Sequence, residues 1–398
     1  MLLPVHPTRL PFESAASAAH GLASETKRMS VSKKLALRTG AIALAATLAL
    51  GACAVNERRP PRDPSTAAQG AFLSGTLNGM GASAQSAAQT FWGAGFQDAH
   101  PDVTVNYDPQ GSGAGRTAFL QGGVAFAGSD SPLRAEHING DLPLCEEGVG
   151  PINLPVYISP IAIAYNLPDV QGLVLDAEVL ALIFSGQITR WDDDRVVALN
   201  PSADLPDLPL TVVRRADDSG TTHNFTEYLE ANAPQAWGEP SSQTFPFAVG
   251  DAAKGTSGVA DATRSALGAI TYTDLSGASG LQLASLRVGD GVSQLSTEGV
   301  AAVVAQSPAA NTGLETDSDL AIAVDHEATE AGAWPLLLVS YLVVCEHYAD
   351  AELGALVGAY ATYIVSPKAQ QAASEGTGSA PLDGDLAARV LTVAEAIG

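Results

Sequence analysis

The sequence is poor in several residue types, and each scarcity limits what the protein can be. Its 398 residues include three cysteines, three methionines and 20 lysines and arginines, against 43 aspartates and glutamates. The formal net charge of −23 argues against nucleic acid or an anionic membrane surface as a partner, because both repel an acidic protein. The seven histidines and the cysteines show no paired ligand spacing, so we expect no metal centre and no cofactor.

Signatures of common catalytic and nucleotide-binding sites are missing as well. The run from Gly79 to Ala84 imitates a dinucleotide fingerprint, but no acidic residue follows at the required strand end. Residues 250–256 lack the order of a P-loop, and no Gly-x-Ser-x-Gly elbow occurs. Ser219 lies at a predicted strand–helix turn, but His223 is too close in sequence to act as its base. We therefore predict that the chain is not an enzyme.

The N-terminal region has the pattern of an export signal. A basic segment, residues 29–38, precedes a short apolar run that ends in Leu50-Gly51-Ala52-Cys53. Small residues before a cysteine are typical of a lipobox, in which the cysteine is acylated and becomes the mature N-terminus. We predict a signal peptide and N-terminal extension over residues 1–52, with Met29 as an alternative start. Residues 53–70 mix charge with proline and are predicted to form a lipidated tether.

Two cysteines remain after the predicted cleavage, Cys145 and Cys345. An exported chain matures in an oxidising compartment, where one disulfide between them is the economical interpretation. Two buried thiols are the alternative that the sequence leaves open.

Strands alternate with helices after the tether. Strands are predicted at 76–78, 103–107 and 124–127, with a helix from Ser83, whose apolar face includes Phe91 and Phe96, and another from Arg116. This order is typical of a parallel sheet with right-handed crossovers. Ligands bind beyond the carboxyl ends of such strands, where the loops at Ser83, Ser112 and Asp130 are expected. A second set of α/β units follows from about residue 157.

The segment 214–222 carries the clearest functional pattern. It follows an apolar strand, residues 210–213, and precedes an amphipathic helix. The first-turn N–H groups of a helix have no intrahelical partner and carry partial positive charge. An arginine, a glycine and hydroxyl groups at this junction favour a socket for a tetrahedral oxyanion. The alternative is an ordinary Ser219 N-cap beside a surface arginine.

Four such phrases, in this order, resemble the phosphate-binding protein of phosphate-specific ABC transporters. They are Gly81-Ala82-Ser83, Gly111–Gly115, Gly128–Leu133 and Arg215–Thr221, within a likeness that runs from about Leu73 to Val393. The resemblance implies a two-lobed α/β fold of the periplasmic-binding-protein type II class. Each lobe would be a mostly parallel sheet flanked by helices, with the ligand in the interlobe cleft. Lobe I would comprise residues 71–156 plus 336–398, and lobe II residues 157–335.

The resemblance also implies a role for each matching residue. Asp130 would accept a hydrogen bond from phosphate, and Asp217 would orient Arg215. The donors would be the amides and hydroxyls of one lobe, Ala82, Ser83, Ala84 and Ser112, and groups of the other, Arg215, Ser219, Gly220 and Thr221. Two departures from the family pattern are a serine at position 83, where threonine is common, and a differently ordered glycine loop at 113–115.

Asp130 is the unusual member of this set. A carboxylate beside an anion costs several kcal/mol in a poorly solvated site unless a proton lies between them. Phosphate at neutral pH still carries a proton and sulfate does not, so one acceptor among donors discriminates between them. The alternative is that Asp130 is a helix N-cap before Pro132.

Together these features predict an extracytoplasmic protein, anchored to the membrane through its lipid alone and monomeric. It would bind inorganic phosphate with high affinity and deliver it to the permease subunits of an ABC importer. Two alternatives stay open: a receptor for another oxyanion or an organic phosphate, and a phosphate-sensing lipoprotein without a transport role.

Overall fold

The computed structural model describes residues 73–382 and 384–398. The predicted signal peptide, the alternative start Met29 and the tether with Cys53 lie outside the described residues. The strands in chain order are β1 (Gly75–Gly81), β2 (Val103–Asp108), β3 (Phe126–Ser129), β4 (Pro151–Tyr165), β5 (Val174–Leu175), β6 (Thr211–Arg215), β7 (Asp251–Ala253), β8 (Ala269–Asp274), β9 (Gln282–Leu283), β10 (Ser285–Val288), β11 (Gly291–Ser293) and β12 (Leu337–Cys345).

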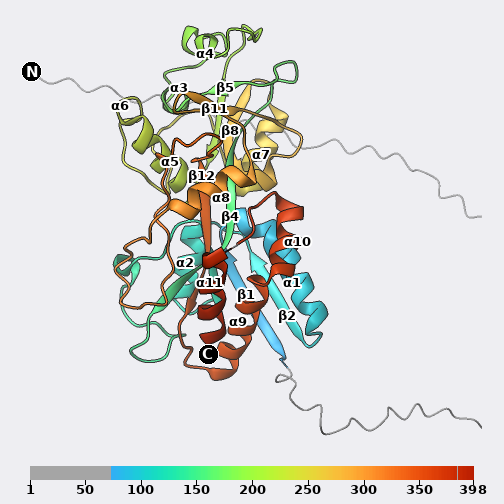
Figure 1. Ribbon diagram of the computed structural model, residues 1–398, viewed down its shortest axis with the longest axis vertical. Helices are drawn as coiled ribbons and strands as arrows, with labels where there is room; N and C mark the ends of the chain where they lie inside the picture. Colours follow the sequence, from blue (N-terminus) through green and yellow to red (C-terminus); the bar gives the residue numbers. More distant parts are fainter. Residues whose placement is uncertain (1–72, 383) are drawn as a thin grey trace, which may run out of the picture. The chain divides into compact units, whose positions relative to one another are not determined.

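The helices alternate with these strands through most of the described chain (Figure 1). They are α1 (Ser86–Ala99), α2 (Ser112–Leu120), α3 (Ala177–Phe184), α4 (Asp194–Leu199), α5 (Gly220–Asn232), α6 (Pro234–Trp237), α7 (Gly255–Ser265), α8 (Thr297–Gln306), α9 (Ala351–Ile364), α10 (Pro367–Thr377) and α11 (Gly384–Ala396). Within the described residues, no helix combines the length and the apolar character that a membrane span requires.

The main sheet runs in the order β2-β1-β3-β12-β4-β8-β6-β7, with β9 paired to β4. At one end β1 pairs parallel with β2 and β3, and at the other β6 pairs parallel with β7 and β8. Between the two parallel sets lie β12 and β4, which are antiparallel to each other and to their outer neighbours. A small second sheet has the order β11-β10-β5. The fold is thus α/β, as predicted, with two parallel sets joined through long antiparallel strands.

The crossing strands β4 and β12 are buried along their whole lengths. Strands covered on both faces read as continuous apolar runs, which explains the extended apolar segment that begins near Trp334. The register shifts between Ser340 and Tyr341, which oppose Tyr157 and Pro155, so Val156 is the extra residue of a bulge. Proline cannot donate a ladder hydrogen bond and is common at such irregularities.

The first helix differs in detail from the sequence prediction. A short 3₁₀ turn, Ser83–Gln85, precedes α1, and the buried face of α1 contains Trp92 and Phe96. The assignment of Phe91 to that face was wrong, because its side chain is 42% exposed and its ring lies over Gly376 of α10. Trp92 and Phe96 are four residues apart, which places them on one face and turns Phe91 away from it.

The second helix begins earlier than predicted. It starts at Ser112 rather than at Arg116, because the glycine loop itself forms the first helical turn. Its N-cap, Gly111, has a φ of 105°, a conformation that favours glycine. The helix therefore presents Ser112 in its first turn, beyond the carboxyl end of β2.

A disulfide joins Cys145 to Cys345, with 5.2 Å between their Cα atoms. It ties the segment before β4 to the end of β12, beside the isolated bridge between Cys145 and Tyr348. The predicted pairing is confirmed, and the alternative of two free thiols is wrong.

Candidate functional site

The turn from β1 into the first helix brings the backbone close to a neighbouring strand. Gly81 has a φ of 147°, and a Cβ there would lie 2.0 Å from the carbonyl oxygen of Gly128. Ala82 N donates to that same oxygen at 2.8 Å. The hydroxyl of Ser83 accepts a hydrogen bond from Thr256 N at 3.0 Å and lies 3.1 Å from Thr256 Oγ1. Ser83 therefore faces the start of α7, and its neighbours Ala82 and Ala84 are buried.

Ser112 links the first α/β set to the second. Its hydroxyl oxygen accepts from Asp130 N at 3.1 Å and from Gly220 N at 3.3 Å. Gly220, the first residue of α5, allows this approach because a Cβ there would lie 2.6 Å from Asp130 Cβ and 2.8 Å from Ser112 Oγ. The first turns of α2 and α5 thus meet at the loop that follows β3.

The Asp130 carboxylate is buried and accepts hydrogen bonds from two hydroxyls. Ser340 of β12 donates to Oδ1 at 2.6 Å, and Thr221 of α5 donates to Oδ2 at 3.1 Å. Burial raises the pKa of Asp130, and the opposing influences are the Ser340 bond, the charge of Arg215, the Thr221 bond and the charge of Arg116. In this structure the side chain is an acceptor between the two α/β sets and caps no helix.

Arg215 lies at the end of β6 and is only 3% exposed. Its Nε donates to Asp217 Oδ1 at 2.8 Å and its Nη2 donates to Asp217 Oδ2, a bidentate pair that fixes the guanidinium plane. Gly255 N also donates to Asp217 Oδ1, at 3.1 Å. Burial acts to raise the pKa of Asp217, but the hydrogen bond and charge of Arg215 outweigh it and the pKa is lowered. The structure gives Asp217 the geometry of an orienting partner for Arg215.

Ser219 is the N-cap of α5. Its hydroxyl accepts from Thr222 N at 3.1 Å, and both Ser219 and Thr221 are buried. The hydroxyl of Thr222 lies 2.7 Å from Tyr272 Oη, which anchors the first turn of α5 to β8. The N-cap that the sequence suggested as an alternative is therefore present, in the same turn as the groups that resemble a phosphate socket.

Sequence reasoning missed Arg116, which lies beneath the same loops. Its guanidinium donates to Ser129 Oγ at 2.6 Å, to Ser131 Oγ at 2.9 Å and to Gln243 Oε1 at 2.7 Å. Burial lowers its pKa to about 10. Arg116 follows Ser112 by four residues, a spacing that places both on one helix face and could have indicated that Arg116 points inward.

Four other buried polar residues also escaped the sequence analysis. Gln85 Nε2 donates to Ser340 Oγ at 2.7 Å, which orients the hydroxyl that binds Asp130. Asn224 Nδ2 donates to the backbone oxygen of Asp130 at 2.7 Å. Thr256 completes the contact with Ser83. These residues support the candidate site through partners far away in the sequence, so no local pattern marks them.

The structure brings the predicted phosphate-binding residues and Asp217 together, whereas the disulfide cysteines lie elsewhere and Cys53 lies outside the described residues. The set consists of the guanidinium of Arg215, a buried carboxylate and three serines at the starts of helices or turns. Arg215, Asp130 and Ser112 are each no more than 3% exposed. Such groups can surround a small anion that offers both acceptors and at least one proton. Among the described residues, no group of three His, Cys, Asp or Glu side chains is arranged to hold a metal ion.

Comparison with known proteins places the chain in a family. Residues 66–368 match the family described as the PBP superfamily domain. Phosphate-binding protein PstS 2 of Mycobacterium tuberculosis is 34% identical over 325 residues, which cover 81% of this chain and 87% of that protein.

Solved structures agree on the fold. A periplasmic phosphate-binding protein, PfluDING, solved with bound phosphate, has a TM-score of 0.65 at 24% identity and covers 80% of this chain and 93% of its own. The phosphate-binding protein of Stenotrophomonas maltophilia has a TM-score of 0.61 at 21% identity, covering 80% and 94%. Both likenesses bear on architecture alone and support the two-lobed binding-protein fold. With the identity and coverage of the mycobacterial relative, they lead to one conclusion: this chain belongs to the PstS family of phosphate-binding proteins.

Proposed function

We propose that the protein is a receptor, not an enzyme, that binds one inorganic phosphate ion and delivers it to an ABC importer. The observation that carries this proposal is the set of groups around Arg215. The bidentate Arg215–Asp217 pair, the first turn of α5 and the hydroxyls of Ser83 and Ser112 supply donors, while Asp130 supplies an acceptor. Ala82, Ala84, Ser219, Gly220 and Thr221 complete the proposed binding set.

The proposal assigns specificity to Asp130. Its burial disfavours a second negative charge beside it unless a proton is shared between the two. Phosphate can donate that proton and sulfate cannot, so sulfate would leave two acceptors facing each other. The alternative is a receptor for an organic phosphate or another oxyanion. The carboxylate disfavours those oxyanions that carry no proton.

The proposal also includes hinged closure of two lobes. We assign residues 71–156 plus 336–398 to lobe I and residues 157–335 to lobe II, with the crossings in β4 and β12. The two parallel strand sets, joined through β4 and β12, support this division. The sets touch where Gly113 N donates to Asp218 O at 3.2 Å and where Ser112 accepts from Gly220 N. Since the donors are divided between the two lobes and the acceptor Asp130 lies in lobe I, only the closed state surrounds the anion with all of them, so phosphate binds that state more tightly and shifts the population toward it.

Calorimetric titration of the purified chain with phosphate, with and without excess sulfate, tests the binding proposal. We expect saturable one-to-one binding that sulfate does not weaken. Absence of binding, or equal affinity for the two anions, would contradict it. A phosphate ester such as glycerol phosphate, titrated in the same way, tests the organic-phosphate alternative, which requires that the ester bind at least as tightly.

We further propose that the protein works outside the cytoplasm as a monomer anchored through lipid on Cys53. The support is the lipobox-like sequence before Cys53 and the disulfide, which forms in oxidising compartments. Mass spectrometry of the protein from its native membrane should find a diacylated N-terminal Cys53. An unmodified chain that starts earlier would overturn the anchor.

A sensing lipoprotein without a transport role is the alternative to delivery, and it predicts normal phosphate uptake by cells that lack this protein.

A further inference from the structure

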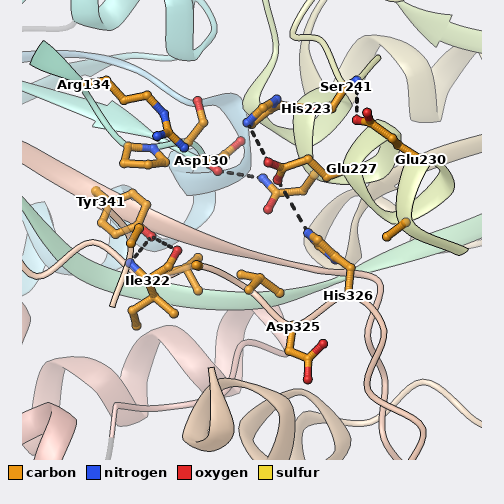
Figure 2. Close-up of a pocket in the computed structure, with 18 of the residues that line it drawn as sticks. Asp130, Arg134, His223, Glu227, Glu230, Ser241, Ile322, Asp325, His326 and Tyr341 are labelled. Atoms are coloured by element: carbon orange, nitrogen blue, oxygen red, sulfur yellow. Dashed lines mark hydrogen bonds and ion pairs between the residues drawn. The ribbon is translucent and has the colours of Figure 1, made fainter. Parts of the chain in front are cut away.

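Two cavities flank the candidate site. The first, which we call the α1–α7 cavity, has a volume of about 460 Å³, lies at the starts of α1 and α7, and is lined in part by Ser83 and Thr256. The second, the α5 cavity, has a volume of about 350 Å³ and is lined in part by Asp130 and by residues of α5 (Figure 2). Each cavity therefore reaches a group of the candidate site.

The two cavities differ in charge. The α1–α7 cavity is lined by hydroxyl-bearing residues and two cations, Lys254 and Arg264, with no carboxylate among its lining residues. Arg264 is paired with Asp261 at 3.1 Å, whereas no described carboxylate lies within 4.0 Å of Lys254 Nζ. Lys254 is thus the cation at this mouth whose charge is not neutralised by a paired carboxylate.

The α5 cavity has the opposite character. Glu227 lies between two histidines, 3.3 Å from His223 Nε2 and 3.6 Å from His326 Nε2 (Figure 2). Arg134 also lines the cavity. Carboxylates outnumber these basic groups among its lining residues: Asp130, Glu227, Glu230, Asp325 and Glu327. An anion that approaches this mouth meets a surplus of negative charge.

Lys254 also bridges the mouth of the α1–α7 cavity. Its Nζ donates to Gln110 Oε1, and Gln110 Nε2 donates to Asp108 Oδ1 at 2.7 Å, which turns the Gln110 oxygen toward the lysine. Gln110 precedes α2 in the first α/β set and Lys254 is the N-cap residue of α7 in the second. The bond therefore joins the two sets at the rim of the cavity.

We propose that phosphate enters and leaves through the α1–α7 cavity, where Lys254 attracts the anion and then holds the mouth closed through Gln110. The inference rests on the proposed function, phosphate binding. In a chain with a net charge of −23, the overall field repels phosphate, so a local cation at the entrance has a large influence on the rate of capture. Lys254 lines the proposed entrance and does not contact the bound ion, so it is a positioning residue.

The test measures rates and affinity separately in three variants. The dissociation rate constant comes from release of ³²P-phosphate into excess unlabelled phosphate, the dissociation constant from calorimetry, and the association rate constant from their ratio. Lys254→Met keeps the length of the side chain and removes its charge. Gln110→Met keeps the charge and removes the bridge, and Arg134→Met removes a cation from the other cavity.

We expect Lys254→Met to lower the association rate constant about threefold to tenfold at low salt. The deficit should fade as KCl approaches about 1 M, where the Debye length is about 3 Å. Gln110→Met should leave association unchanged and speed dissociation, and Arg134→Met should change neither rate. Slowed association in Arg134→Met with normal association in Lys254→Met would overturn the proposed route. Faster dissociation alone in Lys254→Met would overturn its attracting role. No phosphate binding by the wild type would instead contradict the proposed function.

Discussion

The loop after β3 and the loop after β6 each hold one aspartate of the site, and the two carboxylates behave in opposite ways. Asp217 is held by the guanidinium of Arg215, and its pKa is lowered. Asp130 receives hydrogen bonds from the hydroxyls of Ser340 and Thr221 without a direct cation, and burial raises its pKa. The Asp217 carboxylate is paired with Arg215 and orients its guanidinium, which is a donor. The Asp130 carboxylate has no such ion pair and can accept a hydrogen bond from a ligand.

This contrast shows how one site can both bind anions and discriminate among them. The β6 side presents the guanidinium and the first turn of α5, which favour any small anion. The β3 side presents a carboxylate, which tolerates an anion only through a shared proton. Neither side alone surrounds a ligand, so both the affinity and the selectivity depend on contact between the two sides.

Removal of Arg215 should break the donor side and cause the largest loss. We expect Arg215→Ala to weaken phosphate binding by about 2–5 kcal/mol, because it removes a buried cation and leaves the Asp217 carboxylate unpaired beside the anion. Calorimetry gives the difference directly. Arg214→Ala is the matched control, since Arg214 donates to Val249 O and lies over the ring of Phe245. Equal binding by the two variants would show that Arg215 is not the main donor.

A third buried carboxylate, Asp274 at the end of β8, resembles Asp130 rather than Asp217. Burial raises its pKa to about 6, and its partners are the Ser276 backbone and hydroxyl and the Tyr157 hydroxyl. Because the pKa of Asp274 is higher in the folded than in the unfolded state, the protonated carboxyl stabilises the folded protein. This contribution is complete below the unfolded pKa and is lost as pH rises through about 6.

Asp274→Asn should therefore gain stability over the wild type as pH rises. We expect a gain on the order of 1–3 kcal/mol between about pH 5 and about pH 8, measured as free energies of unfolding in urea. Asp290→Asn, at an exposed position, is the control and should show no such trend. A difference between Asp274→Asn and wild type that is the same at both pH values would contradict the assignment.

Ser112 connects the β3 side and the β6 side of the site, because its hydroxyl oxygen accepts from the N–H groups of both Asp130 and Gly220. Ser112→Ala leaves the N–H groups of Asp130 and Gly220 without this acceptor, at a cost of about 1–3 kcal/mol in the closed arrangement. Phosphate affinity should fall by a similar amount in calorimetry. Ser265→Ala, which removes an exposed hydroxyl bonded within its own helix, should bind normally. An Ser112→Ala variant with unchanged affinity would mean that the bridge is dispensable.

Most of the features predicted correctly from sequence have a local cause. The strand–glycine–helix junctions at Ser83, Ser112 and Ser219 are visible because strand, turn and first helical turn are contiguous in the chain. The disulfide followed from compartment and cysteine count. The error at Phe91 was a local one too, since it lies next to the true core residue Trp92.

The supporting residues could not be predicted in this way. Gln85 and Ser340 are 255 residues apart, and Ser83 and Thr256 are 173 residues apart. Only the fold brings such pairs together. The same holds for the antiparallel pairing of β4 and β12, whose continuous apolar sequences indicate burial but carry no information on strand direction.

The most direct test of the account is the ratio of the sulfate and phosphate dissociation constants, measured by calorimetry in the wild type and in Asp130→Asn. An amide can donate to sulfate where a carboxylate cannot, so the account predicts that the ratio falls by at least about tenfold in the variant, mainly through tighter sulfate binding. An unchanged ratio would show that the buried carboxylate does not select the protonated anion.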